Sequence, residues 1–150
     1  MIGVNRLKTD AEVNRLDLID LLSDRHNMVR RISGNAWNEA NEIKISSSEW
    51  YILARIYRKQ PTISSVTKSV DISRQAIHKF IKNLAAKGLV EIHNVENNKK
   101  EKWIQLTDLG EECYEKNEVL KDELEKRIAE TIGQDKIDTL KVILKSDWGI

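Results

Sequence analysis

The sequence contains one cysteine, Cys113, among its 150 residues. A single cysteine cannot form an intramolecular disulfide or supply the paired cysteines of a CxxC metal motif. We therefore expect a reducing compartment, the cytoplasm. Because Cys113 falls on the apolar stripe of an expected helix, we interpret it as a buried structural thiol, and a redox-responsive role stays open as an alternative.

Glycine and histidine are also sparse, and their placement argues against catalysis. The six glycines are scattered, which excludes a phosphate-cradling loop and a dinucleotide-binding fingerprint. The histidines His26, His78 and His93 are isolated from one another, and no HExxH motif is present. We therefore expect no enzyme activity, no cofactor and no metal, with a zinc-responsive regulator kept as an alternative.

Long hydrophobic runs are missing as well. No apolar stretch approaches the roughly 18 residues of a membrane span, and residues 1–10 lack the apolar core of a signal peptide. We expect no membrane partner. The length and the 40% hydrophobic content suit one domain over residues 1–150 with a modest core.

Charge is balanced overall but unevenly distributed. The formal net charge is +1, yet residues 55–105 hold eleven Lys and Arg against four Asp and Glu. The flanks are acidic: residues 1–54 hold seven basic against eight acidic residues, and residues 106–150 hold seven against twelve. A concentrated basic region indicates a polyanionic partner, of which nucleic acid is the commonest.

Helical signals begin early in the chain. Apolar residues recur at three- and four-residue steps between residues 10 and 42, which predicts one long helix. Ser46 and Glu49 then form a capping-box pattern, because the serine accepts from first-turn amides while the glutamate reaches back. A second helix should start there and stop before Pro61, which lacks an amide donor.

Residues 62–84 carry the spacing of a helix-turn-helix. Two helices joined by a tight turn bury a fixed set of positions, and apolar residues occupy them at offsets 0, 4, 6, 11 and 14. These residues are Val66, Val70, Ile72, Ile77 and Phe80. Ser73 is the expected N-cap of the second helix.

A hairpin and two further helices complete the expected fold. Gly88 should end the helix before two β-prone runs, residues 89–95 and 102–106, which are separated by a polar, basic tip. Helical periodicity resumes from residue 107 to Gly133 and again over residues 135–148. The predicted fold is therefore mainly α with a small β-hairpin.

The outer face of the second helix of the motif is polar and basic. A helix that enters the major groove needs donors that reach base edges near its N-terminus and cations that hold phosphates. The candidate DNA-binding residues on this helix are Ser73, Arg74, Gln75, His78, Lys79 and Lys82. An apolar face would instead indicate a protein-interaction module without DNA binding, which is the remaining alternative of a different class.

Three segments, Ser46–Leu53, Ser73–Val90 and Leu106–Gly110, resemble the MarR family of bacterial winged-helix regulators. The resemblance implies a winged helix-turn-helix over residues 46–107, flanked by dimerisation helices over 10–42 and 108–148. It also assigns the hairpin tip to a DNA-contacting wing. The wing candidates are Asn98, Lys99, Lys100 and Lys102, and Asn98 and Lys100 stand where the family usually has Asp and Arg.

Family resemblance further implies a homodimer on a pseudo-palindromic operator. The two apolar terminal stripes agree with this, since they exceed what one small winged helix can cover. Members commonly repress transcription and are relieved by small ligands, oxidants or zinc. For a ligand pocket between the first, second and fifth expected helices, the weak candidates are Trp37, Trp50 and Tyr114.

Overall fold

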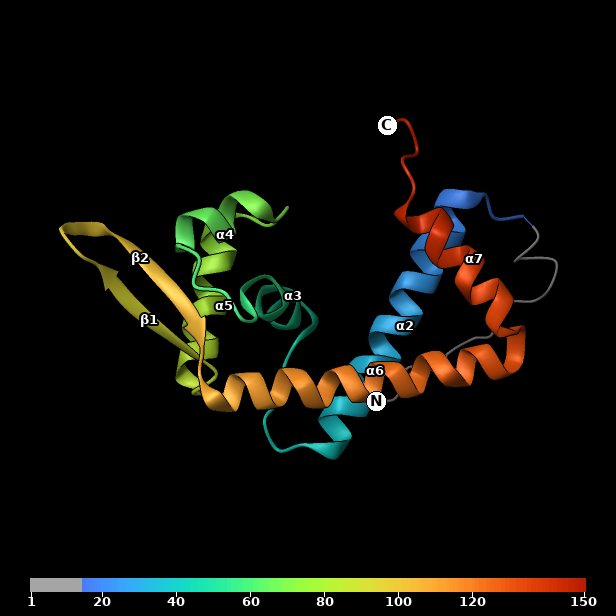
Figure 1. Ribbon diagram of the computed structural model, residues 1–150, viewed down its shortest axis with the longest axis horizontal. Coiled ribbons are helices and arrows are strands. Elements are labelled where there is room, and N and C mark those ends of the chain that lie inside the picture. The colour runs from blue at the N-terminus through green and yellow to red at the C-terminus, as the bar shows by residue number, and fades with distance from the viewer. Residues whose placement is uncertain (1–14) are drawn as a thin grey trace.

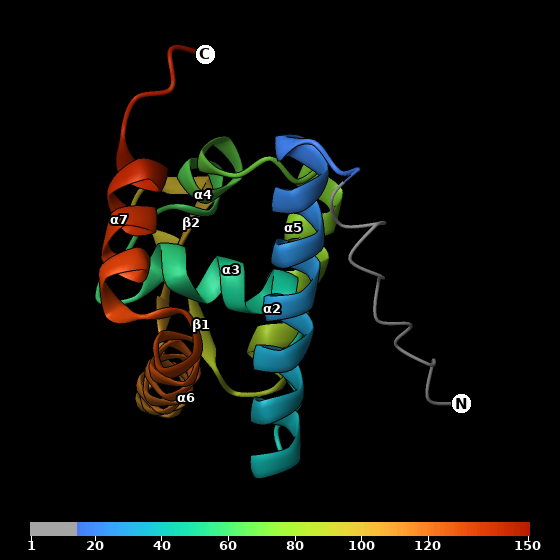
Figure 2. The same cartoon turned by 90° about the vertical axis from the view of Figure 1, so that its right-hand side faces the viewer.

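One long helix joins two parts of the molecule (Figure 1). The structure is a computed structural model and describes residues 15–150. The winged-helix lobe, residues 46–107, lies at one end of the long helix (Figure 1). We call α2 and α7 the arm: α7 lies at the other end, and α2 crosses the long helix near its middle (Figure 1). Figure 2 looks along the long helix, with α2 and α7 on its two sides. The elements are α2 (Leu18–Ala40), α3 (Ser47–Ile56), α4 (Ile63–Ser69), α5 (Arg74–Ala86), β1 (Val90–Val95), β2 (Asn98–Leu106), α6 (Asp108–Ile132) and α7 (Gln134–Lys145). The predicted mainly α fold with a β-hairpin is confirmed.

Helix starts in the lobe follow their local caps. The Ser46 hydroxyl accepts from the Glu49 amide at 3.2 Å, and the Glu49 carboxylate accepts from the Ser46 amide at 3.1 Å. Ser73 caps α5 through the Ala76 amide, as predicted. Each cap satisfies a donor that would otherwise lack a partner at the start of a helix.

The helix-turn-helix core matches its predicted spacing. Val66, Val70 and Ile77 are buried, and Ile72 and Phe80 are partly buried against the same core. The core continues through α3, the hairpin and the start of α6; its other members are Trp37, Ile45, Ile52, Leu53, Ile56, Ile63, Ile81, Leu84, Leu89, Val90, Ile104, Leu106 and Cys113.

The hairpin is longer on its second strand than the sequence suggested. β1 and β2 pair in antiparallel fashion from Val90 opposite Leu106, and the register shifts between Asn94 and Val95. β2 begins at Asn98 and not at residue 102, so the turn contracts to Glu96 and Asn97. Asn97 adopts a φ of 61°, a conformation that asparagine tolerates better than most residues.

Three helix boundaries correct the prediction. α2 starts at Leu18 behind the N-cap Asp17, whose carboxylate accepts from the Asp20 amide at 2.9 Å. Residues 15–17 are therefore not helical, α2 ends at Ala40, and residues 10–14 of the predicted helix lie outside the described residues. α7 spans Gln134–Lys145 and stops before residue 148.

Much of the arm's apolar surface is uncovered in the single chain. Of α7, only Ile137 is buried, and of α2, only Trp37. The exposed large apolar residues of α2, α7 and the chain after α7 are Leu18, Ile19, Leu21, Leu22, Val29, Ile32, Leu140, Val142, Ile143, Leu144, Trp148 and Ile150. Among the described residues, no helix is long and apolar enough to cross a bilayer.

Candidate nucleic-acid interface

The predicted reading face of α5 points away from the core. Its inner residues Ile77, Ile81 and Leu84 are buried, whereas the six candidates on the opposite face are exposed. These are Ser73, Arg74, Gln75, His78, Lys79 and Lys82. Within the described part of the chain, no ion pair neutralises the cations among them, so their charges are available to a polyanion.

The wing carries its candidates at and near the hairpin tip. Asn98 is occupied locally, because its Oδ1 accepts from the amides of Lys100 at 3.0 Å and Glu101 at 3.2 Å. Its side chain therefore shapes the tip. Lys100 and Lys102 are exposed on β2, and the side chain of Lys99 lies outside what the structure describes.

One face of the hairpin is organised by a polar and aromatic cluster. The His93 ring stacks on Trp103 with centroids 4.3 Å apart, and His93 Nε2 lies 3.1 Å from the Glu91 carboxylate. Gln105 donates to the same Glu91 oxygen at 3.0 Å. Hydrogen bonds from Gln105 and His93 lower the pKa of Glu91, and the bond from Gln105 links the two strands across the hairpin.

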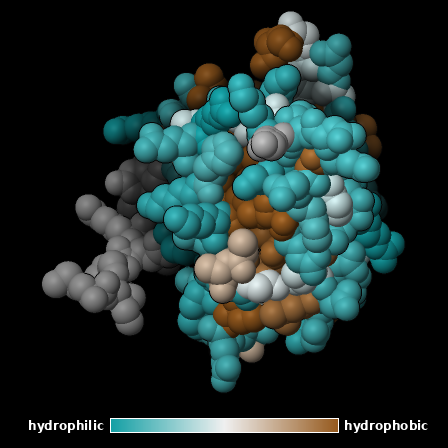
Figure 3. All heavy atoms as spheres, turned by 90° about the vertical axis from the view of Figure 1, so that its left-hand side faces the viewer, coloured by the Kyte–Doolittle hydropathy of each residue, from teal (hydrophilic) through white to brown (hydrophobic). Residues whose placement is uncertain are grey.

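The hairpin is also fastened to the helix-turn-helix. The Ile104 amide donates to the Pro61 carbonyl at 2.9 Å, next to a bridge between Thr62 and Trp103. The face of the molecule seen from this end is largely hydrophilic, with smaller hydrophobic areas (Figure 3). Helix α5 and the hairpin are thus parts of one lobe, and the face of the molecule at this end is mostly polar.

Comparison with solved structures identifies this arrangement. The reduced form of E. coli MarR superposes with a TM-score of 0.76 at 21% identity, covering 87% of this chain and 95% of that one. The chain has the MarR fold. Streptococcus pneumoniae FabT in complex with DNA matches with a TM-score of 0.70 at 19% identity, covering 85% and 90% of the two chains. No family model matches the sequence, and no curated protein matches it significantly.

A third similar structure of the MarR fold is S. aureus MepR in complex with DNA. Its TM-score is 0.70 at 17% identity, and 86% of this chain and 94% of that one are covered. The aligned fraction is larger than the lobe and α6 together, so it includes part of the arm as well. The likeness therefore concerns the whole architecture.

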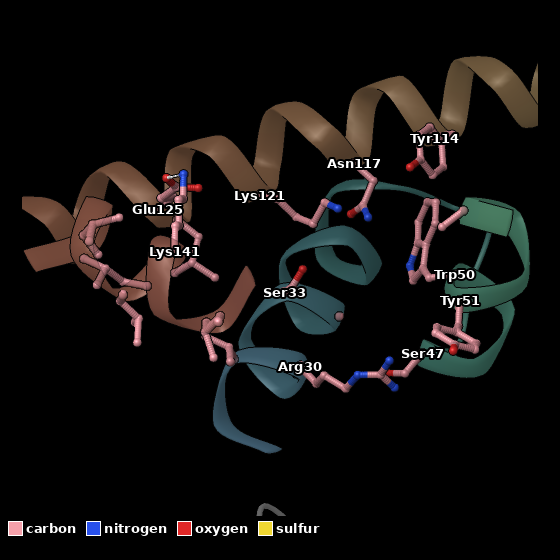
Figure 4. A pocket seen from close by; sticks show the side chains of 18 residues that line it. Arg30, Ser33, Ser47, Trp50, Tyr51, Tyr114, Asn117, Lys121, Glu125 and Lys141 are labelled. Atoms are coloured by element: carbon pink, nitrogen blue, oxygen red, sulfur yellow. Dashed lines mark hydrogen bonds and ion pairs between the residues drawn. The ribbon is translucent and has the colours of Figure 1, made fainter. Parts of the chain in front are cut away.

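In this example of the MarR fold, a cavity of about 480 Å³ lies between α2, α3, α6 and α7 (Figure 4). Trp50 and Tyr114, two of the three ligand candidates, line it. The other lining residues are Val29, Arg30, Ser33, Gly34, Ser47, Tyr51, Ala54, Asn117, Lys121, Leu124, Glu125, Ile128, Ile137, Leu140, Lys141 and Leu144. The predicted location is extended by α7, which supplies part of the wall.

Trp37, the third ligand candidate, is a core residue. Its side chain is fully buried, and its indole N–H donates to the Ile43 carbonyl at 2.8 Å. It supports the cavity only indirectly, through an edge-on contact with Trp50 at 4.9 Å between centroids. Helical periodicity alone did not distinguish a core tryptophan from a lining one.

Asn117 is a cavity residue that sequence reasoning missed. It is 6% exposed, and among the described residues neither its Oδ1 nor the buried Trp50 Nε1 has a hydrogen-bond partner. A buried polar atom without a hydrogen-bond partner is costly, which sets these two atoms apart from the other polar atoms of the cavity wall. The signal was available, because Asn117 interrupts the stripe that Cys113 and Leu120 follow on α6.

Cys113 is buried against the core, as the sequence indicated. Burial raises the pKa of its thiol, which lowers the fraction of the reactive thiolate. Within residues 15–150, no group of three or more His, Cys, Asp or Glu side chains is placed to hold a metal ion.

Proposed function

We propose that the protein is a sequence-specific double-stranded DNA-binding transcription regulator. The observation that carries this proposal is the outer face of α5, where Arg74, Gln75 and their neighbours project from a helix whose opposite side is buried. Arg reads guanine and Gln reads adenine in the major groove. The MarR fold, found in two solved structures that contain DNA, supports the same assignment.

The proposed active species is a homodimer that represses transcription at a pseudo-palindromic operator. Apolar side chains such as Ile19 and Val142, 73% and 68% exposed in the single chain, favour burial against a second copy. Two recognition helices related by a two-fold axis would meet half-sites about one helical turn, roughly 10 bp, apart.

Selection from a random duplex library, followed by titration, tests DNA reading. The wild-type protein should enrich a palindromic duplex, and Arg74→Ala should lose about 1–3 kcal/mol of affinity for it with little change on random duplex. Arg127→Ala, an exposed arginine of α6, is the matched control. Equal losses in the two variants would mean that α5 does not read bases.

We also propose that a small ligand relieves repression by occupying the cavity between α2, α3, α6 and α7. Its support is the pair of polar atoms without partners, Asn117 Oδ1 and Trp50 Nε1, in a wall that is otherwise largely apolar. A thermal-shift screen of small amphipathic molecules should find compounds that stabilise the wild type and release DNA. The same compounds should not stabilise Ser33→Phe, which places a ring in the cavity.

A further inference from the structure

An ion pair between a half-buried lysine and a buried carboxylate lies at the C-terminal end of the recognition helix α5. Lys87, the C-cap of α5, directs its ammonium group at both carboxylate oxygens of Glu49, at 3.0 and 2.8 Å. The same nitrogen donates to the Lys44 carbonyl at 2.6 Å. A lysine ammonium has three donors, and all three have acceptors here.

This ion pair connects segments that are distant in sequence. Glu49 lies in the first turn of α3, where it also accepts from the Ser46 amide, and Lys44 lies in the loop between α2 and α3. Lys87 therefore ties the C-terminal end of α5 to the start of α3 and to the chain leaving the arm. Of the described ion pairs, this is the one with a buried carboxylate, its Glu49 side chain being 6% exposed.

An ion pair at such a position contributes little to the stability of the fold. Removing two charges from water offsets most of their attraction, and apolar replacements of similar size are often as stable. Such a pair does fix the relative position of the two segments that it joins, because each hydrogen bond requires a narrow range of distance and angle. The Glu49–Lys87 pair thus restricts the orientation of α5 in a way that an apolar contact would not.

Small changes in that orientation matter at the other end of the helix. α5 has 13 residues, so it is roughly 20 Å long. A tilt of about 5° at Lys87 would move the N-terminal residues Arg74 and Gln75 by about 2 Å, more than the tolerance of a hydrogen bond to a base edge. Anchoring at the C-terminal end therefore controls reading at the N-terminal end.

We propose that the Glu49–Lys87 ion pair is a positioning element for DNA recognition. It sets the angle of α5 relative to α3 and the α2–α3 loop, and thereby the spacing and orientation at which the two recognition helices of a dimer meet their half-sites. Lys87 acts through α5 and does not itself contact phosphate. The inference rests on the proposed DNA-binding function.

The test uses variants that separate the ion pair from folding. Lys87→Met alone would leave a buried carboxylate unpaired, which destabilises the fold. The double variant Glu49→Gln/Lys87→Met removes both charges, and glutamine retains the capping hydrogen bond to the Ser46 amide, so its melting temperature should stay close to that of the wild type. Lys87→Arg keeps the charge, and Lys126→Met on α6 is the control for losing one exposed cation.

Each variant is titrated against the duplex enriched by the wild type, against the same duplex with one base pair added or removed between half-sites, and against random duplex. The double variant should bind the enriched duplex about tenfold more weakly, about 1.4 kcal/mol, and lose the preference for the original spacing. Its binding to random duplex and its salt slope should match those of the wild type, whose net charge it keeps, whereas Lys126→Met shows the effect of losing one cation alone. Lys87→Arg should retain most of the wild-type affinity.

Three outcomes contradict these proposals in different ways. If the wild type enriches no duplex, the proposed DNA-binding function and this inference both fail. If the enriched duplex exists but the double variant keeps its affinity and spacing preference, only the positioning role fails. A parallel loss on random duplex with a lower salt slope would instead mean that Lys87 itself binds phosphate.

Discussion

The winged-helix lobe and the arm differ in how they cover their apolar residues. In the lobe, α3, α4, α5 and the hairpin close over a shared core, and Ile52, Leu53 and Ile77 are fully buried. In the arm, most large apolar residues of α2 and α7 remain exposed in the single chain. The lobe is therefore complete within one chain, whereas the arm has the composition of an interface that a second chain would complete.

The largest expected effect comes from breaking the arm. Ile19→Asp/Val142→Asp places charges at residues that are 73% and 68% exposed in one chain, so the folded monomer should tolerate them while a dimer interface should not. We expect sedimentation at micromolar concentration to show a dimer for the wild type and a monomer for the variant, with operator binding abolished. Ile92→Asp, at a 39% exposed apolar residue of the wing, is the control that should stay dimeric. A folded wild-type monomer would contradict the dimer proposal.

The next prediction compares the effect of alanine substitution at two glycines, Gly110 in α6 and Gly34 in α2. A Cβ on Gly110 would lie 2.0 Å from the Leu89 carbonyl oxygen, whereas a Cβ on Gly34 would meet nothing within 4 Å. Gly110→Ala should therefore cost at least about 3 kcal/mol of unfolding free energy, the upper end of overpacking effects. Gly34→Ala, in the interior of α2, should stabilise by about 0.5–1 kcal/mol. Urea unfolding measures both, and equal stabilities would mean that the lobe does not close tightly where β1 meets α6.

The lobe was predicted from the sequence more accurately than the arm, because the residues that indicate the lobe's helices lie close together in the chain. The caps at Ser46 and Ser73 involve residues three positions apart, and the helix-turn-helix spacing is fixed by one turn. The start of α2 was misjudged because the apolar period continued through residues 15–17, although Asp17 was available as a cap. The interruption of the α6 stripe at Asn117 is visible in the sequence, but that this residue lines a cavity could be seen only once four helices were placed in space.

The predictions for the hairpin and for the last helix were wrong for a different reason. β2 begins at Asn98 through backbone pairing, so its polar side chains gave no strand alternation to detect. At the end of α7, Trp148 satisfied the apolar period of a helix, yet its indole folds back to donate to the Ile143 carbonyl from outside the helix. The periodicity of a sequence shows which side chains are apolar, but it does not show which backbone amides remain hydrogen-bonded within a helix.

Within the lobe, the wing and α5 can be compared with each other, because we expect the wing to bind phosphates and α5 to contact bases. Lys99→Ala/Lys100→Ala/Lys102→Ala should weaken binding to enriched and random duplexes alike. The salt slope should fall by about one unit for each phosphate that the variant no longer neutralises, counted twice in a dimer. Titrations at several salt concentrations measure this, with Lys126→Ala in the long helix as the control. If the triple variant keeps the wild-type salt slope, the wing does not contact DNA.

The smallest expected effect is the acid sensitivity of the wing. Hydrogen bonds from Gln105 and His93 depress the pKa of Glu91 below its ordinary value of 4.5 in the folded state. A group with a lowered folded pKa stabilises the fold above its unfolded pKa, and that contribution disappears as the pH falls through the folded value. The stacking of His93 on Trp103 should therefore loosen below pH 4.5.

NMR of the Trp103 indole during acidification measures this loosening directly, since the ring stacks on His93 and lies two residue pairs from Glu91 in the hairpin register. Glu91→Gln keeps an acceptor for Gln105 but removes the titrating carboxylate, so the indole signal of this variant should not shift over the same range. A Trp103 shift with the same midpoint in Glu91→Gln would place the acid-sensitive group elsewhere, and the hairpin would then be held in register by its backbone pairs and the Trp103 stack alone.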